Sequence, residues 1–316
     1  MRYMELGSSG IQVSKMGLGT WAIGGGPAWS GGPSEQNAVD TIVEAVKQGI
    51  NMVDTAPGYN FGASEGIVGK ALKRVDREKV ILVTKCGVVW NRKGTVWNKV
   101  GDRQLYRLLT PESVKLEVEE SLDRLGTDYI DLYMTHWPSV PPFETPIAET
   151  VGALNELKTD GKIRAIGAAN VSISQIKEYV DCCELDLVQG KYSVLDRAVE
   201  DELLPLCREN KITMQAYSPL EQGLLTGTIT RDYRPEPGNM ERVIDMLDEW
   251  KPLCDKYDCT IPTLCLAWVM NQGGEVNLLT GATAPDQVDM NARAADIVIN
   301  EADLCTMREM AEALDA

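Results

Sequence analysis

Side chains suited to proton transfer follow three short apolar runs of the sequence, where buried strands would end. Asp54 and Lys85 each close one of these runs, and Tyr59 stands shortly after Asp54. His136, the only histidine among the 316 residues, follows a third run. A phenol with its ordinary pKa of about 10 is a weak acid at neutral pH, but a neighbouring ammonium lowers that pKa, and a carboxylate holds the ammonium in place. Together these groups could donate a proton to a carbonyl oxygen while hydride adds to the carbon.

Each of these residues also has an ordinary structural explanation when it is taken singly. Asp54 could cap the helix that follows it, and Lys85 could be a solvated charge. Tyr59 could be an exposed loop aromatic, and a lone histidine after a strand is more often structural than catalytic. The chemical interpretation therefore depends on a fold that brings all of these strand ends to one place.

Eight short apolar runs alternate with longer amphipathic segments along the chain. The runs are continuous and rich in Leu and β-branched residues, which is typical of parallel strands covered on both faces. They span Lys15–Gly19, Asn51–Asp54, Val80–Lys85, Tyr129–Met134, Ile163–Gly167, Leu187–Gln189, Thr213–Tyr217 and Val276–Gly281. The other segments predict helices over Ser34–Gly49, Ser64–Lys73, Thr110–Gly126, Ile147–Gly161, Ser174–Val180, Val199–Glu209, Met240–Tyr257, Ile261–Gln272 and Glu301–Leu314.

This alternation predicts an α/β fold, a (β/α)₈ TIM barrel that forms a single domain over residues 1–316. A Gly-Ser-Ser-Gly turn between Arg2–Leu6 and Ile11–Ser14 predicts a β-hairpin ahead of the barrel. Two long insertions, Val88–Leu109 and Leu224–Asn239, follow the third and seventh predicted strands. In such a barrel the carboxyl ends of the strands share one rim, where catalytic residues lie.

A doubly wound dinucleotide-binding fold is the alternative architecture. The segment Gly17–Ala22 reads G-x-G-x-x-A, which matches the fingerprint of that fold as a string. The fingerprint requires a helix to begin there, but the glycines and prolines of residues 24–33 cannot start one. The barrel is therefore the favoured interpretation.

Composition excludes several classes of function. With 31 basic and 47 acidic residues the formal net charge is −16, which disfavours binding to nucleic acid or to anionic lipid. A single histidine rules out a His-rich metal site, and the eight cysteines lack metal-ligand spacing, so we expect no metal. The first residues lack the apolar core of a secretory signal, which favours a cytoplasmic protein with reduced thiols. The sequence leaves the oligomeric state open.

Three segments that carry these residues resemble motifs of the aldo-keto reductase superfamily. They are Asn51–Asn60 with Asp54 and Tyr59, Leu82–Gly87 with Lys85, and Tyr133–Pro138 with His136. The resemblance continues in order through Gly167–Asn170, Leu187–Gln189, Gln215–Leu220 and Gly281–Gln287, so it covers essentially the whole chain. It implies a barrel that binds an extended nicotinamide cofactor without a doubly wound domain and that reduces aldehydes or ketones.

The resemblance also implies a role for individual residues. Tyr59 would be the general acid, Lys85 held by Asp54 would lower its pKa, and His136 would orient the substrate carbonyl. Asn170 and Gln189 would bind the nicotinamide carboxamide, and Tyr217 would stack on the nicotinamide ring. The residues along the pyrophosphate would be Ser218, Leu220, Gly223 and Leu224. Those toward the adenosine end would be Thr283, Asp286, Gln287 and Asn291. The remaining cofactor-binding positions would be Gly19, Thr20, Trp21, Asp54 and Gly281. Ordinary helix capping is the alternative for Asp286, Gln287 and Asn291.

The choice between the two nicotinamide cofactors depends on Thr283 and Ala284. Relatives that use NADPH commonly place Lys or Ser and then Arg at these positions, and that arginine grips the 2′-phosphate. Here the arginine is missing and Asp286 stands nearby, so we expect NAD(H), with NADP(H) less favoured. Ala169 also stands where many relatives have Ser, so one hydrogen bond to the carboxamide is either missing or replaced by another.

Tryptophans mark a candidate pocket for a small carbonyl or sugar substrate. Trp21, Trp29, Trp90 and Trp137 lie at or beyond predicted strand ends and are expected to line the pocket, with Trp97 as a further aromatic on the same face. The alternative is that some of them only pack the loops.

We therefore expect an NAD(H)-dependent oxidoreductase that reduces small aldehydes or ketones such as methylglyoxal. An NAD-dependent sugar or polyol dehydrogenase, with Tyr59 as the base, is the enzymatic alternative. A non-catalytic, cofactor-sensing barrel is the other alternative, and the intact set of Asp54, Tyr59, Lys85 and His136 argues against it.

Overall fold

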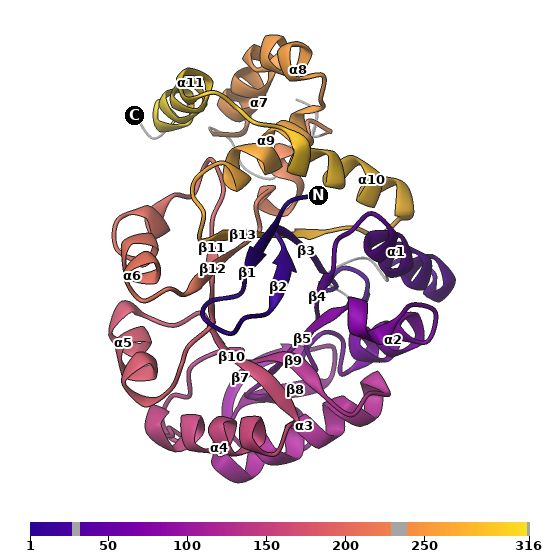
Figure 1. Ribbon diagram of the computed structural model, residues 1–316, viewed down its shortest axis with the longest axis vertical. Helices are drawn as coiled ribbons and strands as arrows, with labels where there is room; N and C mark the ends of the chain where they lie inside the picture. Colours follow the sequence, from indigo (N-terminus) through magenta and orange to yellow (C-terminus); the bar gives the residue numbers. More distant parts are fainter. Residues whose placement is uncertain (27–31, 229–238, 315–316) are drawn as a thin grey trace.

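The apolar runs of the sequence become the parallel strands of a closed barrel. The computed structural model describes residues 1–26, 32–228 and 239–314. Within these ranges, eight strands pair in parallel in the order β10-β11-β12-β13-β3-β4-β5-β9 and close on themselves (Figure 1). Their bounds are β3 Met16–Gly19, β4 Met52–Asp54, β5 Ile81–Cys86, β9 Ile130–Thr135, β10 Ile163–Ala169, β11 Leu187–Lys191, β12 Thr213–Tyr217 and β13 Val276–Gly281. The predicted fold class, a (β/α)₈ barrel in a single domain, is confirmed.

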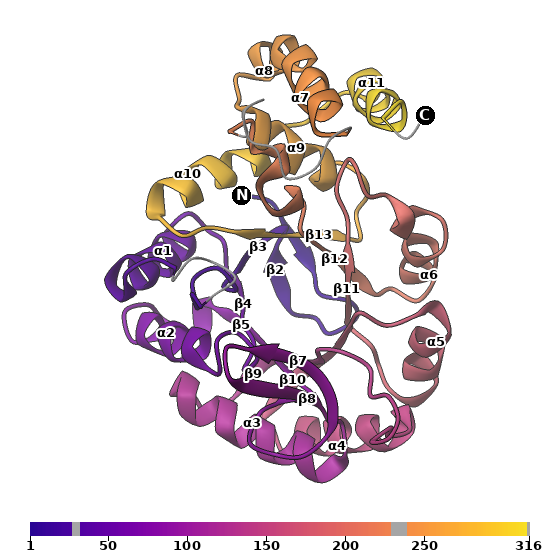
Figure 2. The same ribbon diagram turned by 180° about the vertical axis from the view of Figure 1, so that it is seen from behind.

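Helices surround the strands and bury their apolar faces against them (Figure 1). Those of the outer layer are α1 Glu35–Lys47, α2 Ala63–Leu72, α3 Pro111–Leu125, α4 Ile147–Thr159, α5 Ile173–Cys182, α6 Leu203–Glu209, α9 Ile261–Met270 and α10 Pro285–Arg293. A further group, α7 Asn239–Glu249, α8 Lys251–Tyr257 and α11 Glu301–Glu312, gathers at one end of the molecule (Figure 2). Within the described residues, no helix has the length and apolar character needed to cross a membrane.

Local sequence signals set several helix ends. The Ser34 and Thr110 side chains accept hydrogen bonds from backbone N–H groups in the first turns of α1 and α3. Gly126 ends α3 with φ of 65°, a left-handed conformation that glycine adopts without steric cost. Ser172 and Gln175 form a reciprocal capping box at the start of α5.

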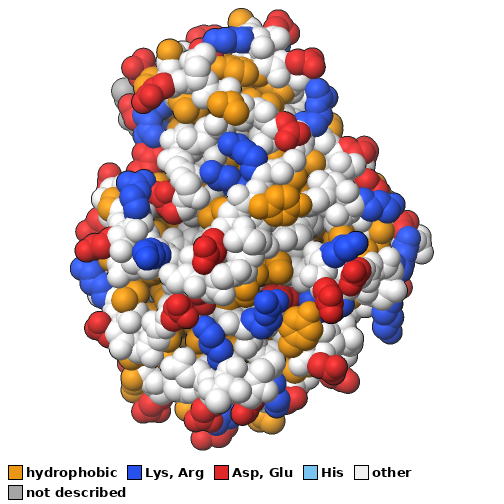
Figure 3. All heavy atoms as spheres, in the orientation of Figure 1, with side chains coloured by type: hydrophobic (Ala, Val, Ile, Leu, Met, Phe, Trp, Pro, Cys, Tyr) orange, Lys and Arg blue, Asp and Glu red, His pale blue; other side chains and the backbone are white. Residues whose placement is uncertain are grey.

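A β-hairpin closes the amino-terminal end of the barrel, as predicted. Strands β1 (Tyr3–Glu5) and β2 (Gln12–Ser14) pair antiparallel and lie across the opening that faces the viewer in Figure 1. Leu6, Ile11 and Val13 pack with side chains of the barrel interior, including Met52 and Leu132. On this face, acidic and basic side chains are interspersed around the edge rather than gathered by sign (Figure 3).

Prolines explain two differences from the predicted helices. Met240–Tyr257 is not one helix but α7 and α8, which meet at Trp250. Pro252 cannot continue α7 because it lacks an N–H and its ring clashes with the carbonyl four residues earlier, but it is tolerated in the first turn of α8. For the same reason Val199–Glu209 divides into the 3₁₀ turn η3 (Ala198–Glu200) and α6, whose first turn contains Pro205.

Two elements were not predicted from the sequence. Helix α10 begins at Pro285, directly after the last barrel strand. The insertion over residues 88–109 contains a small antiparallel sheet in the order β6-β8-β7, formed by β6 (Val88–Val89), β7 (Thr95–Val100) and β8 (Arg103–Arg107). This sheet, called here the insertion sheet, lies on the side of the barrel opposite the hairpin (Figure 2). It therefore stands over the carboxyl ends of the strands.

The hairpin predicts a test of how the barrel end is sealed. Leu6 is fully buried in the interior cluster, so Leu6→Ala should leave a cavity and lower the free energy of unfolding by about 2–5 kcal/mol. Leu116→Ala is the matched control, because Leu116 on α3 is 52% exposed and should change stability by less than about 0.5 kcal/mol. Urea titration followed by circular dichroism measures both values, and equal losses would show that the hairpin is not part of the cooperative core.

Candidate active site

The structure brings together the four residues of the predicted proton-transfer cluster, Asp54, Tyr59, Lys85 and His136. Asp54 is the last residue of β4, Lys85 lies near the end of the adjacent β5, and His136 directly follows β9. The Lys85 Nζ atom lies 2.6 Å from Asp54 Oδ1 and 3.2 Å from Tyr59 Oη. The rings of Tyr59 and His136 meet edge to face, with centroids 5.7 Å apart. Strand order thus places residues from three strands at one rim.

Lys85 and Asp54 form an ion pair that water barely reaches. Each side chain is 1% exposed, and the ammonium also donates to the backbone carbonyl of Thr55 at 3.0 Å. Burial lowers the pKa of Lys85, whereas Asp54 and Tyr59 raise it. The two partners together outweigh burial, so the net pKa of Lys85 lies above its ordinary value. Lys85 therefore keeps its positive charge at neutral pH, beside the Tyr59 oxygen.

The pKa of Tyr59 differs in net direction from the sequence-based expectation. Burial raises this pKa, Lys85 lowers it, and the net pKa of Tyr59 lies above its ordinary value. The influence of Lys85 has the expected sign, but desolvation of the phenol outweighs it. Tyr59 consequently holds its proton at neutral pH, in the state required of a proton donor.

His136 is neutral in this environment. Burial, together with the positive charges of Lys85 and Arg107, holds the pKa of His136 well below its ordinary value. Its Nδ1 atom is buried and has no hydrogen-bond partner within the described part of the chain. A neutral imidazole next to a phenol can donate one hydrogen bond to a carbonyl oxygen without adding charge.

Gln189 contacts the ion pair directly. Its Nε2 atom donates to Asp54 Oδ2 at 2.9 Å and to Gln215 Oε1 at 2.6 Å. Gln215 in turn donates to Asn277 Oδ1 at 2.8 Å, and Asn277 donates to the backbone carbonyl of Ser14. This polar ladder crosses the barrel interior from β11 to β13 and supports the Asp54 carboxylate. Of these three residues, only Gln189 was predicted to lie in the site. For Gln215 and Asn277 the one available signal was that each is a polar residue inside a predicted apolar strand.

Asn170 and Tyr217 lie beside His136. The Asn170 side chain donates to the backbone carbonyl of His136 at 2.9 Å and accepts from Tyr217 Oη at 3.2 Å. Asn170 and Ser218 directly follow β10 and β12 with φ of 58° and 54°, a left-handed conformation that is uncommon outside glycine. Strained backbone of this kind clusters at functional sites because the surrounding structure holds it.

Thr20 and Ser64 fix the backbone of the cluster rather than facing its opening. The buried Thr20 hydroxyl donates to the Asp54 carbonyl at 2.8 Å and lies 2.7 Å from Ser64 Oγ. Ser64 was absent from the predicted site. Gly19 ends β3 beside Asp54, and Trp21 is 44% exposed with its ring centroid 6.3 Å from that of Tyr59.

The predicted tryptophans divide between two places. The rings of Trp137 and Trp97 lie tilted at 43° with centroids 5.6 Å apart, and the centroid of Trp97 lies 6.5 Å from that of His136. Trp90 instead packs edge to face against Phe61. Trp29 lies outside the described residues, as does most of the second insertion. Trp97, on β7, was not assigned to the pocket because its position over His136 depends on the insertion sheet.

Residues of the predicted adenosine end shape the loop between β13 and α10. The Gln287 side chain accepts from the Thr283 N–H at 2.8 Å, and Asn291 donates to the backbone carbonyl of Gly281 at 3.2 Å. These bonds tie the loop to α10, and no side-chain hydrogen bond caps this helix at Ala284. Asp286 is exposed in the first turn of α10.

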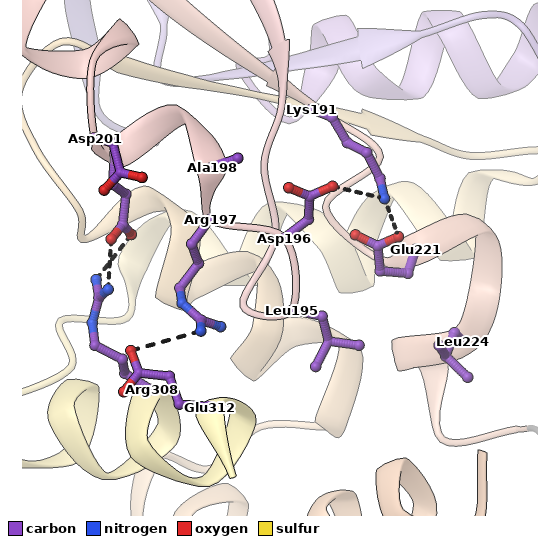
Figure 4. Close-up of a pocket in the computed structure, with 11 residues that line it drawn as sticks. Lys191, Leu195, Asp196, Arg197, Ala198, Asp201, Glu221, Leu224, Arg308 and Glu312 are labelled. Carbon is purple, nitrogen blue, oxygen red and sulfur yellow. Dashed lines mark hydrogen bonds and ion pairs between the residues drawn. The ribbon is translucent and has the colours of Figure 1, made fainter. Parts of the chain in front are cut away.

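The predicted pyrophosphate segment borders an open cleft. Ser218, Leu220 and Gly223 lie in or just before the 3₁₀ turn η4 (Glu221–Thr226). Leu224 lines one wall of a cleft of about 630 Å³ whose charged side chains pair with each other (Figure 4). Lys191 contacts Asp196 at 3.0 Å and Glu221 at 2.8 Å. The lining of the cleft includes none of the four residues of the proton-transfer cluster, although Lys191 ends β11 opposite Tyr217.

These residues fit a nicotinamide dinucleotide. Two side-chain amides, Asn170 and Gln189, and the partly exposed ring of Tyr217 stand next to the proton-transfer cluster. Residues 218–224 contain no lysine or arginine. The backbone N–H groups of η4 are therefore the donors that this segment can offer to the pyrophosphate oxygens. The arrangement provides amide partners for a carboxamide, a planar ring for stacking and a protonated phenol for a reacting oxygen.

Comparison with known proteins assigns the chain to a family. The model of the aldo/keto reductase family matches residues 15–312. The chain is 62% identical to the NADH-specific methylglyoxal reductase of Escherichia coli (strain K12) over the full length of both proteins. This identity agrees with the resemblance of Gly17–Gly26, Trp90–Leu105 and Leu220–Tyr233 to a bacterial NADH-dependent methylglyoxal reductase.

Solved structures give the same result. The glycerol dehydrogenase of Gluconobacter oxydans superposes with a TM-score of 0.88 at 33% identity, covering 98% of this chain and 94% of that one. An aldo-keto reductase from Klebsiella pneumoniae in complex with NADPH superposes with a TM-score of 0.76 at 26% identity and the same coverage of both chains. The barrel, its strand-end residues and these matches agree, and the chain belongs to the aldo/keto reductase family of oxidoreductases.

Proposed function

We propose that this enzyme reduces small aldehydes and ketones, methylglyoxal among them, with NADH as the hydride donor and Tyr59 as the general acid. The observation that carries the proposal is the continuous contact from Asp54 through Lys85 to Tyr59, at 2.6 and 3.2 Å. The 62% identity to a methylglyoxal reductase supports the choice of substrate. The bound nicotinamide would supply a hydride to the carbonyl carbon.

The residues of the cluster divide the remaining work. His136, neutral and beside Tyr59, donates a hydrogen bond that orients the carbonyl oxygen. Tyr59 transfers its proton to that oxygen as negative charge develops there, and solvent later returns the proton. Lys85 stabilises the resulting phenolate because its ammonium lies 3.2 Å away. Asp54, held by Gln189, keeps Lys85 in place and balances its charge.

The 62% identity to a methylglyoxal reductase favours reduction over the alternative of sugar or polyol oxidation. Reduction starts from a protonated phenol, and Tyr59 is protonated at neutral pH because burial raises its pKa above the ordinary value. The alternative of a non-catalytic, cofactor-sensing barrel is also disfavoured. Sensing a cofactor does not require a proton donor, yet all four residues of the proton-transfer cluster are present and in contact.

The cofactor preference rests on the loop that precedes α10. Residues 281–286 contain no lysine or arginine, and Asp286 adds a negative charge beside the position that a 2′-phosphate would occupy. The name of the Escherichia coli relative supports NADH, whereas the Klebsiella pneumoniae structure was obtained with NADPH at a lower identity of 26%. We infer that NADH is preferred.

The free cysteine thiols support a cytoplasmic location.

Replacing the proposed acid gives the first test of this function. Tyr59→Phe should lower kcat/KM for methylglyoxal by about 10²–10⁴-fold, because the proton donor is lost while the ring remains. NADH binding, measured by fluorescence titration, should stay within about threefold of wild type. Tyr3→Phe is the control, since Tyr3 is 52% exposed on the hairpin at the other end of the barrel. Full turnover by Tyr59→Phe would mean that another group donates the proton.

The cofactor preference is tested by adding the missing charge. Wild type should show a higher kcat/KM for NADH than for NADPH, and Ala284→Arg should shift this ratio toward NADPH by about tenfold or more, since a charge-assisted bond to phosphate contributes about 1.5–3 kcal/mol. Met290→Arg adds the same charge at an exposed position later in α10 and should leave the ratio unchanged. Steady-state kinetics with both cofactors decide the matter, and equal use of NADPH by wild type would contradict the inferred preference.

A further inference from the structure

Arg107 is a partly buried cation without a carboxylate partner among the residues that the structure describes. It ends β8 of the insertion sheet, and its guanidinium carbon lies 4.8 Å from the ring centroid of Trp137 and 5.6 Å from that of Trp97. Its Nε atom is buried without a hydrogen-bond partner in the described ranges. Partial burial lowers the pKa of Arg107. The charge is thus held by two aromatic rings and is left uncompensated.

This position is close to the proposed carbonyl site. Trp97, on which Arg107 lies, has its ring centroid 6.5 Å from that of His136, and Trp137 is the next residue in the chain. The charge of Arg107 also contributes to lowering the pKa of His136, so the two groups are within electrostatic reach of each other. A short molecule that places its carbonyl oxygen at His136 would therefore extend its other end toward Arg107.

Several other arginines of this acidic protein do have carboxylate partners. Arg92, in the same insertion, forms two hydrogen bonds with the Glu120 carboxylate at 2.8 and 2.9 Å. In the charged cleft of Figure 4, Arg308 likewise contacts Glu200, and Arg197 contacts Glu312. With 47 acidic residues in the chain, an unpaired guanidinium beside the candidate catalytic histidine stands apart. A desolvated charge is unfavourable unless an opposite charge meets it, and a guanidinium matches a carboxylate in planar, bidentate geometry.

We propose that Arg107 binds the carboxylate of an anionic carbonyl substrate, so that short aldehydes or ketones bearing a carboxylate are a preferred substrate class of this enzyme. The inference rests on the proposed reductase function and adds the charge of the substrate to it. In this arrangement His136 and Tyr59 hold the carbonyl oxygen, while Trp97 and Trp137 line the side of the pocket along which the substrate reaches Arg107. The reaction itself is unchanged: hydride adds to the carbonyl carbon, Tyr59 supplies the proton, and the carboxylate only positions the substrate.

The experiment compares charged and neutral aldehydes of similar length with NADH. Glyoxylate, 4-oxobutanoate and 5-oxopentanoate are the carboxylates, and butanal, pentanal and methylglyoxal are the neutral substrates. In wild type, at least one carboxylate should exceed the neutral aldehyde of similar length in kcat/KM by about tenfold. Arg107→Met, which keeps an apolar side chain on the tryptophans, should lower kcat/KM for that carboxylate by about 10–100-fold, mainly through KM, and should leave the neutral substrates within about threefold.

Arg103→Met is the matched control. Arg103 lies on the same strand, but its guanidinium stacks on Phe61 at 3.7 Å from the ring centroid rather than on the tryptophans beside His136. This variant should keep the preference for the carboxylate. Arg107→Lys, which keeps the charge but loses the planar fork, should fall between wild type and Arg107→Met. Butanoate titrated into the NADH complex and followed by tryptophan fluorescence should bind wild type and Arg103→Met more tightly than Arg107→Met.

Each other result has a defined meaning. If Arg107→Met slows charged and neutral aldehydes equally, Arg107 acts on the structure or on His136, and the inference is overturned. If wild type turns over methylglyoxal but shows no preference by charge, the inference also fails while the reductase function stands. If wild type reduces none of these aldehydes, the proposed function itself is wrong.

Discussion

The structure depends on keeping the charges of Lys85 and Asp54 together inside the barrel. Removing an ammonium and a carboxylate from water costs several kcal/mol for each ion, and close contact offsets this only when the remaining polar atoms are also satisfied. The 2.6 Å contact, the bond to the Thr55 carbonyl and the bond from Gln189 meet that condition. Because β4 and β5 are neighbours in the barrel, the two residues meet with little freedom to move apart.

The barrel interior is divided along its axis to support this pair. At the amino-terminal end, the hairpin contributes Leu6, Ile11 and Val13 to an apolar cluster with the inward-facing strand residues. Above it, the ladder of Gln189, Gln215 and Asn277 gives the interior a polar layer in which each amide has a partner. The apolar end excludes water, while the polar layer holds Asp54 in a single orientation.

The barrel mouth has an electrostatic character unlike the rest of the protein. The chain carries a formal net charge of −16, yet the described groups that act on His136 are two cations, the ammonium of Lys85 and the unpaired guanidinium of Arg107. Both charges oppose protonation of His136, which keeps that imidazole neutral. Lys85, in contact with Tyr59, stabilises the negative charge that develops during proton transfer, and the charge of Arg107 attracts an anionic substrate.

The sequence by itself determined the barrel, the hairpin and the residues of the proton-transfer cluster. Continuous apolar runs define buried parallel strands, and a closed parallel barrel leaves one rim for the residues that follow them. The single helix predicted over Met240–Tyr257 was wrong, because periodicity joined α7 and α8 across Pro252. Only the tertiary structure decided that Gln189 supports Asp54, that desolvation outweighs Lys85 in setting the pKa of Tyr59, and that the insertion sheet brings Trp97 and Arg107 to His136. These features depend on how deeply individual polar groups are buried and on contacts between segments far apart in the chain, which local residue patterns do not specify.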